Sequence, residues 1–296
     1  MSVHQRIAIT GASGLIGTAL VGHLKAEGHT VQRLVRRAPV GADEVQWDPQ
    51  TGFVDLEPLR GVDAVIHLAG VGVGDKRWSK KYKSEILNSR LLGTTAIANA
   101  VTELKPQVFI SASAIGWYGE SGNRAVVETD RVGDDFLAAV CREWEAAADL
   151  AQDVRTVKIR TGLVLDPTGG ALGKMLPLFR LGLGGKLGNG KQWWSWITLH
   201  DQLRAIIFAL ENPISGPVNL TAPNPVTNQE FTAALARAMH RPALFPAPAI
   251  ALKIALGGFS SEVLGSKKVI PHVLQEAGFT WDYPHISEAL SALIED

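Results

Sequence analysis

The segment Thr10-Gly11-Ala12-Ser13-Gly14-Leu15-Ile16-Gly17 constrains the fold more than any other part of the chain. It follows an apolar run, Arg6–Thr10, that predicts a strand, and it opens an amphipathic stretch, residues 14–27, that predicts a helix. In this context the glycines permit a tight turn, close backbone approach to a pyrophosphate and close helix–sheet packing. The helix N-terminus presents free N–H groups to the anion. We therefore predict a dinucleotide phosphate loop, the alternative being a plain strand–turn–helix with incidental glycines.

Further apolar runs alternate with helical stretches over the first two-thirds of the chain. Such alternation is typical of βαβ units, and it predicts an α/β fold with a Rossmann-type doubly wound parallel sheet. The predicted strands are Thr30–Val35 and residues 64–68, 108–111 and 155–164, and the predicted helices are Lys80–Leu104 and residues 134–150.

The pattern changes after Leu165. Residues 166–199 are rich in glycine, contain three tryptophans and show little periodicity, which predicts a loop-rich segment covering a site. Further on, residues 201–211 and 227–240 predict helices, 217–220 a strand and 241–284 an irregular, partly proline-rich stretch. We expect a nucleotide-binding domain over residues 1–165 and 200–222. A smaller, mainly C-terminal substrate lobe would take 166–199 and 223–284, and a closing helix 285–296.

Composition narrows the classes of partner. Lysine plus arginine equals aspartate plus glutamate at 29 each, so no overall field favours nucleic acid or a membrane, although a local basic patch stays open. The single cysteine, Cys141, excludes an internal disulfide and a thiolate cluster, and the histidines lack metal-ligand spacing. With no apolar run of about 18 residues and no leader pattern, we expect a cytoplasmic protein without metal, nucleic-acid or membrane partners.

The second predicted strand ends in two arginines, Arg36 and Arg37. In this fold the end of that strand faces the adenine ribose, where an acidic residue suits the 2′-hydroxyl of NAD and arginine suits the 2′-phosphate of NADP. A guanidinium matches phosphate geometry bidentately. The pair therefore predicts NADP(H), the alternative being a solvated basic pair on a loop.

Short motifs are spread along the chain after the Thr10–Gly17 loop. They are His67-Leu68-Ala69-Gly70, Arg77-Trp78, Ser89-Arg90, Ser111-Ala112-Ser113-Ala114-Ile115-Gly116-Trp117-Tyr118-Gly119, Trp144-Glu145, Arg160-Thr161-Gly162-Leu163, Ser195-Trp196-Ile197 and Asn219-Leu220-Thr221-Ala222-Pro223. Together they resemble the extended short-chain dehydrogenase/reductase superfamily, and more narrowly its atypical NAD-dependent epimerase family subgroup, which is related to nucleotide-sugar epimerases. The resemblance covers essentially the whole chain.

The resemblance implies which residues contact the cofactor. They lie at the carboxyl ends of the parallel strands, where such sheets bind ligands. By resemblance the cofactor phosphates contact the glycine loop, and Arg36 and Arg37 lie near the adenosine. The residues at the carboxyl ends of the later strands would line the remainder of the cofactor, toward the nicotinamide. The implied set is Gly11, Ser13, Gly14, Leu15, Ile16, Arg36, Arg37, Leu68, Ala69, Gly70, Ser111, Ala112, Arg160, Thr161 and Gly162.

The superfamily's catalytic tyrosine–lysine pair is missing from this sequence. In that pair the lysine lowers the phenol pKa so that tyrosine can move a proton. The three tyrosines are Tyr82, Tyr118 and Tyr283, and none has lysine four residues later. By resemblance Leu137 and Cys141 occupy the two positions, Ala114 replaces the usual serine and Arg90 the usual asparagine. Any chemistry must therefore use other groups.

Several residues are candidates for such a role. Tyr118 follows the fourth strand and could donate or accept a proton, or it could be a packed aromatic. Ser113 could bind a substrate oxygen or satisfy a turn. Arg90 could pair with a substrate anion or with Glu145. Trp194 and Trp196 could stack on the substrate, or they could fasten the lobe to the sheet.

Two hypotheses follow from these observations. One is an NADP(H)-dependent, epimerase-like oxidoreductase of a small polar substrate with altered proton-transfer groups. The other is a non-catalytic NADP(H)-binding sensor or scaffold, which the missing pair favours. Related proteins often form dimers through two long helices, which here would include Lys80–Leu104. The sequence alone does not decide the oligomeric state.

Overall fold

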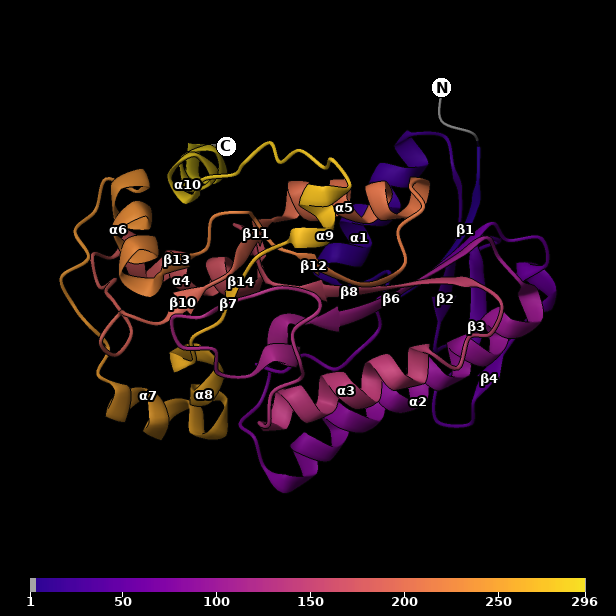
Figure 1. Ribbon diagram of the computed structural model, residues 1–296, viewed down its shortest axis with the longest axis horizontal. Coiled ribbons are helices and arrows are strands. Elements are labelled where there is room, and N and C mark those ends of the chain that lie inside the picture. The colour runs from indigo at the N-terminus through magenta and orange to yellow at the C-terminus, as the bar shows by residue number, and fades with distance from the viewer. Residues whose placement is uncertain (1–3, 296) are drawn as a thin grey trace.

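The computed structural model describes residues 4–295 and is built on one eight-stranded sheet (Figure 1). Seven of its strands run parallel, and the edge strand β4 pairs antiparallel with β3. This confirms the predicted Rossmann-type α/β fold. In sheet order the strands are β12 (Gly216–Leu220), β8 (Arg155–Thr161), β6 (Val108–Ala114), β5 (Ala64–His67), β1 (Arg6–Thr10), β2 (Thr30–Val35), β3 (Glu44–Asp48) and β4 (Phe53–Val54).

Helices cover both faces of the sheet, which explains why all four residues of β5 are buried. Helices α1 (Leu15–Ala26), α5 (Leu199–Glu211) and α9 (His272–Glu276) share one apolar core with one face of the sheet. Helices α2 (Lys80–Leu104) and α3 (Phe136–Ala148) pack on the other face (Figure 1). The carboxyl edge of the parallel strands is left between these layers and the smaller lobe.

Helix α2 shows how local chemistry fixes an element that borders the site. It starts after Ser79, whose side chain accepts the N–H of Tyr82 at 3.1 Å. It ends where Lys105 adopts a left-handed conformation with φ of 50°, directly before Pro106. The predicted bounds, Lys80–Leu104, are confirmed.

A second core lies in the smaller lobe, at the left of Figure 1. It is formed by α4 (Gly170–Arg180), α6 (Asn228–Ala238) and α10 (Ile286–Glu295), with β9 (Leu163–Asp166) pairing in parallel with β11 (Trp196–Thr198). The remaining elements are β7 (Ala125–Val126), β10 (Trp193–Trp194), β13 (Val226–Thr227), β14 (Lys268–Val269), α7 (Ala249–Leu256), α8 (Ser260–Leu264), η1 (Glu57–Leu59), η2 (Ile115–Tyr118) and η3 (Gly257–Phe259).

Several parts of the chain differ from the sequence prediction. The strand predicted over 155–164 is two strands, β8 in the large sheet and β9 beside β11. The stretch 241–284, predicted to be irregular, contains the short helices α7, α8 and α9. The segment predicted to be loop-rich, 166–199, contains the eleven-residue helix α4, despite Gly173 and Pro177 within it. Burial of Leu172, Leu176 and Phe179 on one face stabilises this helix against its poor intrinsic propensity. Strands β3 and β4 were not predicted. The sequence of β3, Glu-Val-Gln-Trp-Asp, contains only two apolar residues, and β4 has only two residues in all.

The lobe boundary also differs in detail from the expected one. Within the expected lobe segment 223–284, Leu274 and Phe279 pack into the main core of the large sheet. The closing helix α10 instead packs on α6 through Ile286, Ala289 and Leu290. Among the described residues, no helix combines the length and hydropathy needed to cross a membrane.

Candidate functional site

The turn after β1 approaches the neighbouring strand so closely that it requires glycine. Gly11 has φ of +70°, and a Cβ there would lie 2.8 Å from the backbone nitrogen of Ala69. A Cβ on Gly17 would lie 2.1 Å from the carbonyl oxygen of Gly11. These contacts leave no room for side chains. The first turn of α1 therefore lies directly against the sheet edge, as predicted for a phosphate loop.

Thr10 fastens this turn to the end of β5. Its hydroxyl accepts the N–H groups of Leu68 at 3.1 Å and Ala69 at 3.3 Å, and its Oγ1 lies 2.7 Å from Nδ1 of His67. With both acceptor positions used, the hydroxyl proton points to Nδ1, which must be unprotonated. Complete burial lowers the pKa of His67 to about 3, so the ring stays a neutral acceptor at ordinary pH.

The N-terminus of α1 is open to an anion. Gly14 at the N-cap provides no capping side chain, and the first turn of the helix contains no acidic residue. Its N–H groups and dipole therefore keep their capacity for negative charge. A cavity of about 1440 Å³ begins at this point. It is lined by the glycine turn, the ends of β2, β3 and β5, and one side of α2.

Eight of the predicted cofactor residues line this cavity: Gly11, Ser13, Gly14, Arg36, Arg37, Leu68, Ala69 and Gly70. Leu15 lies against Gly169 instead, and Ile16 packs on the main core. Ser111 is completely buried, and neither it nor Ala112, Arg160, Thr161 or Gly162 lines the cavity. The predicted residues that follow β1, β2 and β5 therefore share one cavity, and those on β6 and β8 lie outside it.

The two arginines at the end of β2 have different partners. Arg37 donates to both carboxylate oxygens of Glu44, at 2.8 and 2.7 Å. The Arg37 guanidinium holds the pKa of Glu44 at about 2, well below its usual value. Arg36 is exposed and lines the cavity, and no carboxylate lies within ion-pair distance of it among the described residues. Arg36 is therefore the cation of this pair that is available to a ligand.

The far wall of the cavity was not predicted from the sequence. It includes Trp47 at the end of β3, and Lys81, Ser84 and Asn88 on α2. Spacings of three and four residues place the α2 side chains on one helical face. That spacing was the available signal, but polar residues at helical intervals more often form a solvated face.

A buried ion pair fills the space between β6, β8 and α3. Arg160 donates to the two oxygens of Glu145 at 2.8 and 2.9 Å, and Ser113 donates to the same carboxylate at 2.7 Å. The Arg160 guanidinium also lies 4.0 Å from the ring centroid of Trp117. Arg160 and Glu145 are only 2% and 4% exposed, so this is a closed structural network.

Tyr118 belongs to the same network. Its hydroxyl donates to Oδ1 of Asn219 at 2.7 Å and accepts from Arg160 at 3.1 Å. Burial raises the pKa of Tyr118 to about 12. A phenol with both hydrogen-bonding roles occupied and a raised pKa is poorly suited to proton transfer. This geometry favours the packed-aromatic alternative for Tyr118. Ser113 lies within β6 and donates to Glu145, so it is a structural residue but not the turn serine that was its expected alternative.

The three predicted substrate residues lie in different surroundings. Arg90 donates to the carbonyls of Val71 and Ile86 and stacks on Trp144, 4.7 Å from the ring centroid. It does not pair with Glu145, which Arg160 already occupies. Trp196 is completely buried in the lobe core, which leaves no face for a ligand. Trp194 is half-buried and packs edge-to-face on Phe231.

The two positions at which the resemblance would place the tyrosine and the lysine hold packed side chains. Leu137 and Cys141 on α3 both lie against Gly116, and the Cys141 thiol donates to the carbonyl of Ala114 at 3.6 Å. Burial raises the pKa of Cys141 to about 12, so it remains a thiol. This part of α3 is an apolar contact with the end of β6.

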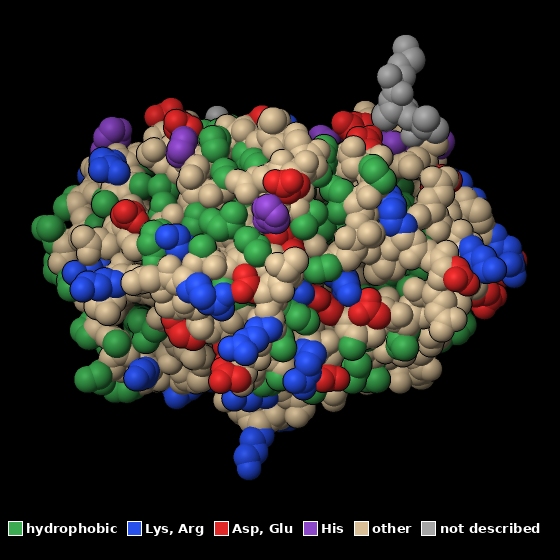
Figure 2. All heavy atoms as spheres, in the orientation of Figure 1, with side chains coloured by type: hydrophobic (Ala, Val, Ile, Leu, Met, Phe, Trp, Pro, Cys, Tyr) green, Lys and Arg blue, Asp and Glu red, His purple; other side chains and the backbone are tan. Residues whose placement is uncertain are grey.

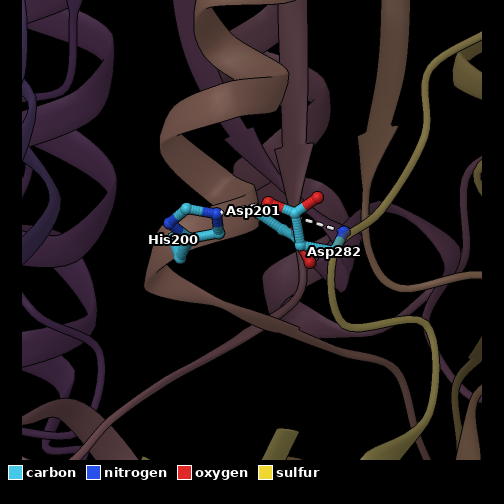
Figure 3. A group of neighbouring side chains, drawn as sticks. All are labelled: His200, Asp201 and Asp282. Atoms are coloured by element: carbon cyan, nitrogen blue, oxygen red, sulfur yellow. Dashed lines mark hydrogen bonds and ion pairs between the residues drawn. The ribbon is translucent and has the colours of Figure 1, made fainter. Parts of the chain in front are cut away.

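His200, Asp201 and Asp282 form a separate polar group where α5 meets the C-terminal segment (Figure 3). Their ligand atoms lie within 4.8 Å of one another. However, Asp201 is already satisfied by the N–H groups of Asp282 and Tyr283 and by Arg204. The Arg204 guanidinium also lies 3.2 Å from Asp282. Because both carboxylates already have partners within the chain, we assign the group to holding the C-terminal segment against α5.

Two family models match this chain, and together they cover most of its length. Residues 7–221 match the NAD dependent epimerase/dehydratase family, and residues 247–293 match a domain of unknown function, DUF1731. The chain is therefore an atypical epimerase-like protein of the extended short-chain dehydrogenase/reductase type. It belongs to the NAD dependent epimerase/dehydratase family.

The similarity to individual relatives extends over nearly the full length of this chain. An epimerase family protein of Mycobacterium bovis is 46% identical over 288 residues, covering 96% of both chains. A chloroplastic SDR39U1 homolog of Arabidopsis thaliana is 39% identical, covering 98% of this chain and 86% of its own. The crystal structure of human epimerase family protein SDR39U1 (isoform 2) with NADPH has a TM-score of 0.91. It is 34% identical and covers 98% of this chain and 99% of its own.

Replacing Thr10 tests how the phosphate turn is held. Thr10→Val removes the hydroxyl that accepts from Ala69 and donates to His67, which should lower the free energy of unfolding by about 1–3 kcal/mol. Thr10→Ser keeps the hydroxyl and should retain most of the stability. Urea unfolding measures both variants, and equal losses would show that the hydroxyl does not hold the turn.

Breaking the buried ion pair should be costly. Glu145→Ala leaves the Arg160 charge uncompensated, and we expect unfolding free energy to fall by about 3–5 kcal/mol. The matched control is Glu143→Ala on the same helix, whose exposed pair with Arg142 should contribute less than about 1 kcal/mol. Chemical denaturation compares the two, and similar values would contradict the assignment.

Tyr118→Phe separates a structural phenol from a catalytic one. It leaves Oδ1 of Asn219 without its donor, so we expect a loss of about 1–3 kcal/mol in unfolding free energy. The thermal shift on adding NADPH should stay as in the unchanged protein. Unchanged stability together with loss of a turnover reaction would instead assign the phenol to proton transfer.

Proposed function

We propose that the protein is an NADP(H)-binding, epimerase-like oxidoreductase of a small polar substrate with altered proton-transfer groups. The observation that carries the proposal is Arg36, an exposed guanidinium that has no acidic partner within residues 4–295. It lies at the rim of a cavity that begins at an uncapped helix N-terminus. NADPH in the human relative, 34% identical over almost the whole chain, supports the same cofactor.

Two parts of the cavity suit two parts of NADP(H): the glycine turn suits the pyrophosphate, and Arg36 suits the 2′-phosphate. The lack of side chains at Gly11 and Gly14 lets the backbone approach a pyrophosphate. The N–H of Gly14 donates to Gly11, so the free N–H groups are those of the uncapped first turn of α1. Arg36 provides a fork of donors for a 2′-phosphate, while Arg37 is held by Glu44 and positions the loop. The nicotinamide, when bound, would supply hydride transfer.

Proton transfer would have to come from groups other than the tyrosine–lysine pair. Tyr118 and Ser113 are committed to the Arg160–Glu145 network. The cavity itself is lined by Asp75, Lys76 and Lys81, which lie on the loop before α2 and on its first turn. Tyr82 and Glu85 on α2 line the same side, and the Tyr82 hydroxyl donates to the carbonyl of Gly72. A substrate in the cavity could meet these titratable side chains on that side.

A second candidate function is a non-catalytic NADP(H)-binding protein. The specific observation that favours it is the sealed end of β6, where Leu137 and Cys141 pack against Gly116. The two functions share the cofactor and differ in turnover. A screen of NADPH oxidation with aldehydes, ketones, quinones and nucleotide sugars separates them: a saturable rate supports the enzyme, and binding without any rate supports the sensor.

Arg36→Ala tests the cofactor assignment. Loss of a charge-assisted contact of about 1.5–3 kcal/mol should weaken NADPH binding by about tenfold or more. Binding of NADH, which lacks the 2′-phosphate, should change little. Isothermal titration calorimetry measures both dissociation constants.

The matched control is Arg142→Ala, which removes an exposed arginine from α3 outside the cavity. It should leave both dissociation constants unchanged. Equal weakening of NADPH and NADH by Arg36→Ala would refute the 2′-phosphate role. Absence of binding of either cofactor to the unchanged protein would refute the proposed function as a whole.

A further inference from the structure

The end of the smaller lobe exposes large apolar side chains that no part of the described chain covers. Leu181, Leu244, Ile250 and Ile254 are 69–74% exposed, and Phe245 and Leu183 are 59% and 51% exposed. We call these six residues the apolar patch. Helix α7, which contributes the two isoleucines, has no buried residue at all. Apolar groups that protrude together on a surface usually mark an interaction site.

The patch is continuous because its two segments are joined by backbone hydrogen bonds. The N–H of Phe245 donates to Gly184 at 3.2 Å, and the N–H of Ala247 donates to Lys186 at 2.9 Å. Helix α7 follows directly from this second segment. All these elements lie at the left end of the molecule in Figure 1, where Figure 2 shows hydrophobic side chains together with several lysines and arginines.

The two segments that carry the patch contain positive charge only, although Glu262 on the neighbouring helix α8 lies just beyond them. Residues 167–200 and 231–261 contain no aspartate or glutamate, although the chain as a whole is neutral. The expectation of no membrane partner was based on that overall balance, which averages over this local asymmetry. No carboxylate lies within ion-pair distance of these cations in the part of the chain that the structure describes. The seven cations are Lys174, Arg180, Lys186, Lys191, Arg237, Arg241 and Lys253.

A shallow hollow adjoins the patch at the end of α6. It has a volume of about 530 Å³ and is lined by Arg237, His240 and Arg241, with Ala236 and Pro242. Leu244 and Phe245 follow this segment directly in the chain. The hollow therefore places two guanidinium groups, which match phosphate oxygens, next to side chains that prefer hydrocarbon.

We propose that this end of the lobe binds reversibly to the surface of an anionic lipid bilayer. The apolar patch enters the boundary between headgroups and acyl chains, as the apolar faces of interfacial helices do. The surrounding cations meet the negative surface potential, and the hollow at Arg237 and Arg241 takes a lipid phosphate. The proposal does not depend on the proposed function, because the phosphate turn and cavity are built on other elements.

Charge and shape favour a bilayer over other occupants. A second copy of this chain in a two-fold contact would bring the same cations face to face, which opposes association. A folded protein partner would need deep complementary pockets, because the side chains of the patch are up to 74% exposed. A bilayer accepts protruding apolar groups without such a surface.

Sedimentation of the full-length protein with vesicles tests the proposal. Vesicles of phosphatidylcholine with phosphatidylglycerol should bind the protein, more weakly as salt rises, while pure phosphatidylcholine binds little. Joint replacement of Ile250→Glu and Ile254→Glu should weaken binding at least about tenfold, because it removes apolar area and adds repulsion. The control Leu150→Glu alters an exposed apolar residue outside the patch and should leave binding unchanged.

Three outcomes would overturn the proposal: no sedimentation with either vesicle, equal binding by the double variant, or equal loss in Leu150→Glu. A dimer in light scattering that the double variant dissociates would assign the face to a second copy. Circular dichroism and the thermal shift with NADPH show whether each variant folds. A failure of vesicle binding with an intact NADPH shift would leave the proposed function untouched.

Discussion

The close approach between the turn after β1 and the end of β5 is the contact on which the candidate site depends. Gly11 reaches the backbone of Ala69 at a distance that excludes a Cβ, and Thr10 holds the same two strands through its hydroxyl. Burial of His67 keeps its ring neutral, so this hydrogen bond has the same direction at every ordinary pH. Because the turn is fixed in this way, the N-terminus of α1 faces the cavity and can bind an anion there.

The carboxyl edge of the sheet is divided into an open part and a sealed part. Along β1, β2 and β5 it borders the cavity, with Arg36 available to a phosphate. Along β6 and β8 it is closed by Arg160, Glu145, Ser113 and Tyr118, whose hydrogen bonds satisfy one another. Superfamily catalysis would use the second part, and here that part stabilises the fold. The two parts of the edge therefore differ: one borders an open cavity, and the other is filled by side chains that satisfy one another.

The glycine turn between β1 and α1 and the bounds of α2 could be predicted from the sequence, because both follow local rules of spacing and capping. The binding roles of Arg36 and Arg37 stay predictions. The sequence could not show which arginine is free, since the partner of Arg37 is Glu44 on β3, a strand with only two apolar residues. Nor could it show that Arg160 is buried, because the carboxylate that compensates its charge lies on α3, fifteen residues earlier. Helix α4 escaped prediction because tertiary burial overrides its glycines and proline.

A crystal structure of the unchanged protein with NADPH tests the central claim most directly. The account predicts the pyrophosphate at the backbone of Gly11 to Gly14 and the 2′-phosphate on the Arg36 guanidinium, with the Arg37–Glu44 pair intact. A 2′-phosphate bound to Arg37 with that pair broken, or a nucleotide bound away from the glycine turn, would contradict it.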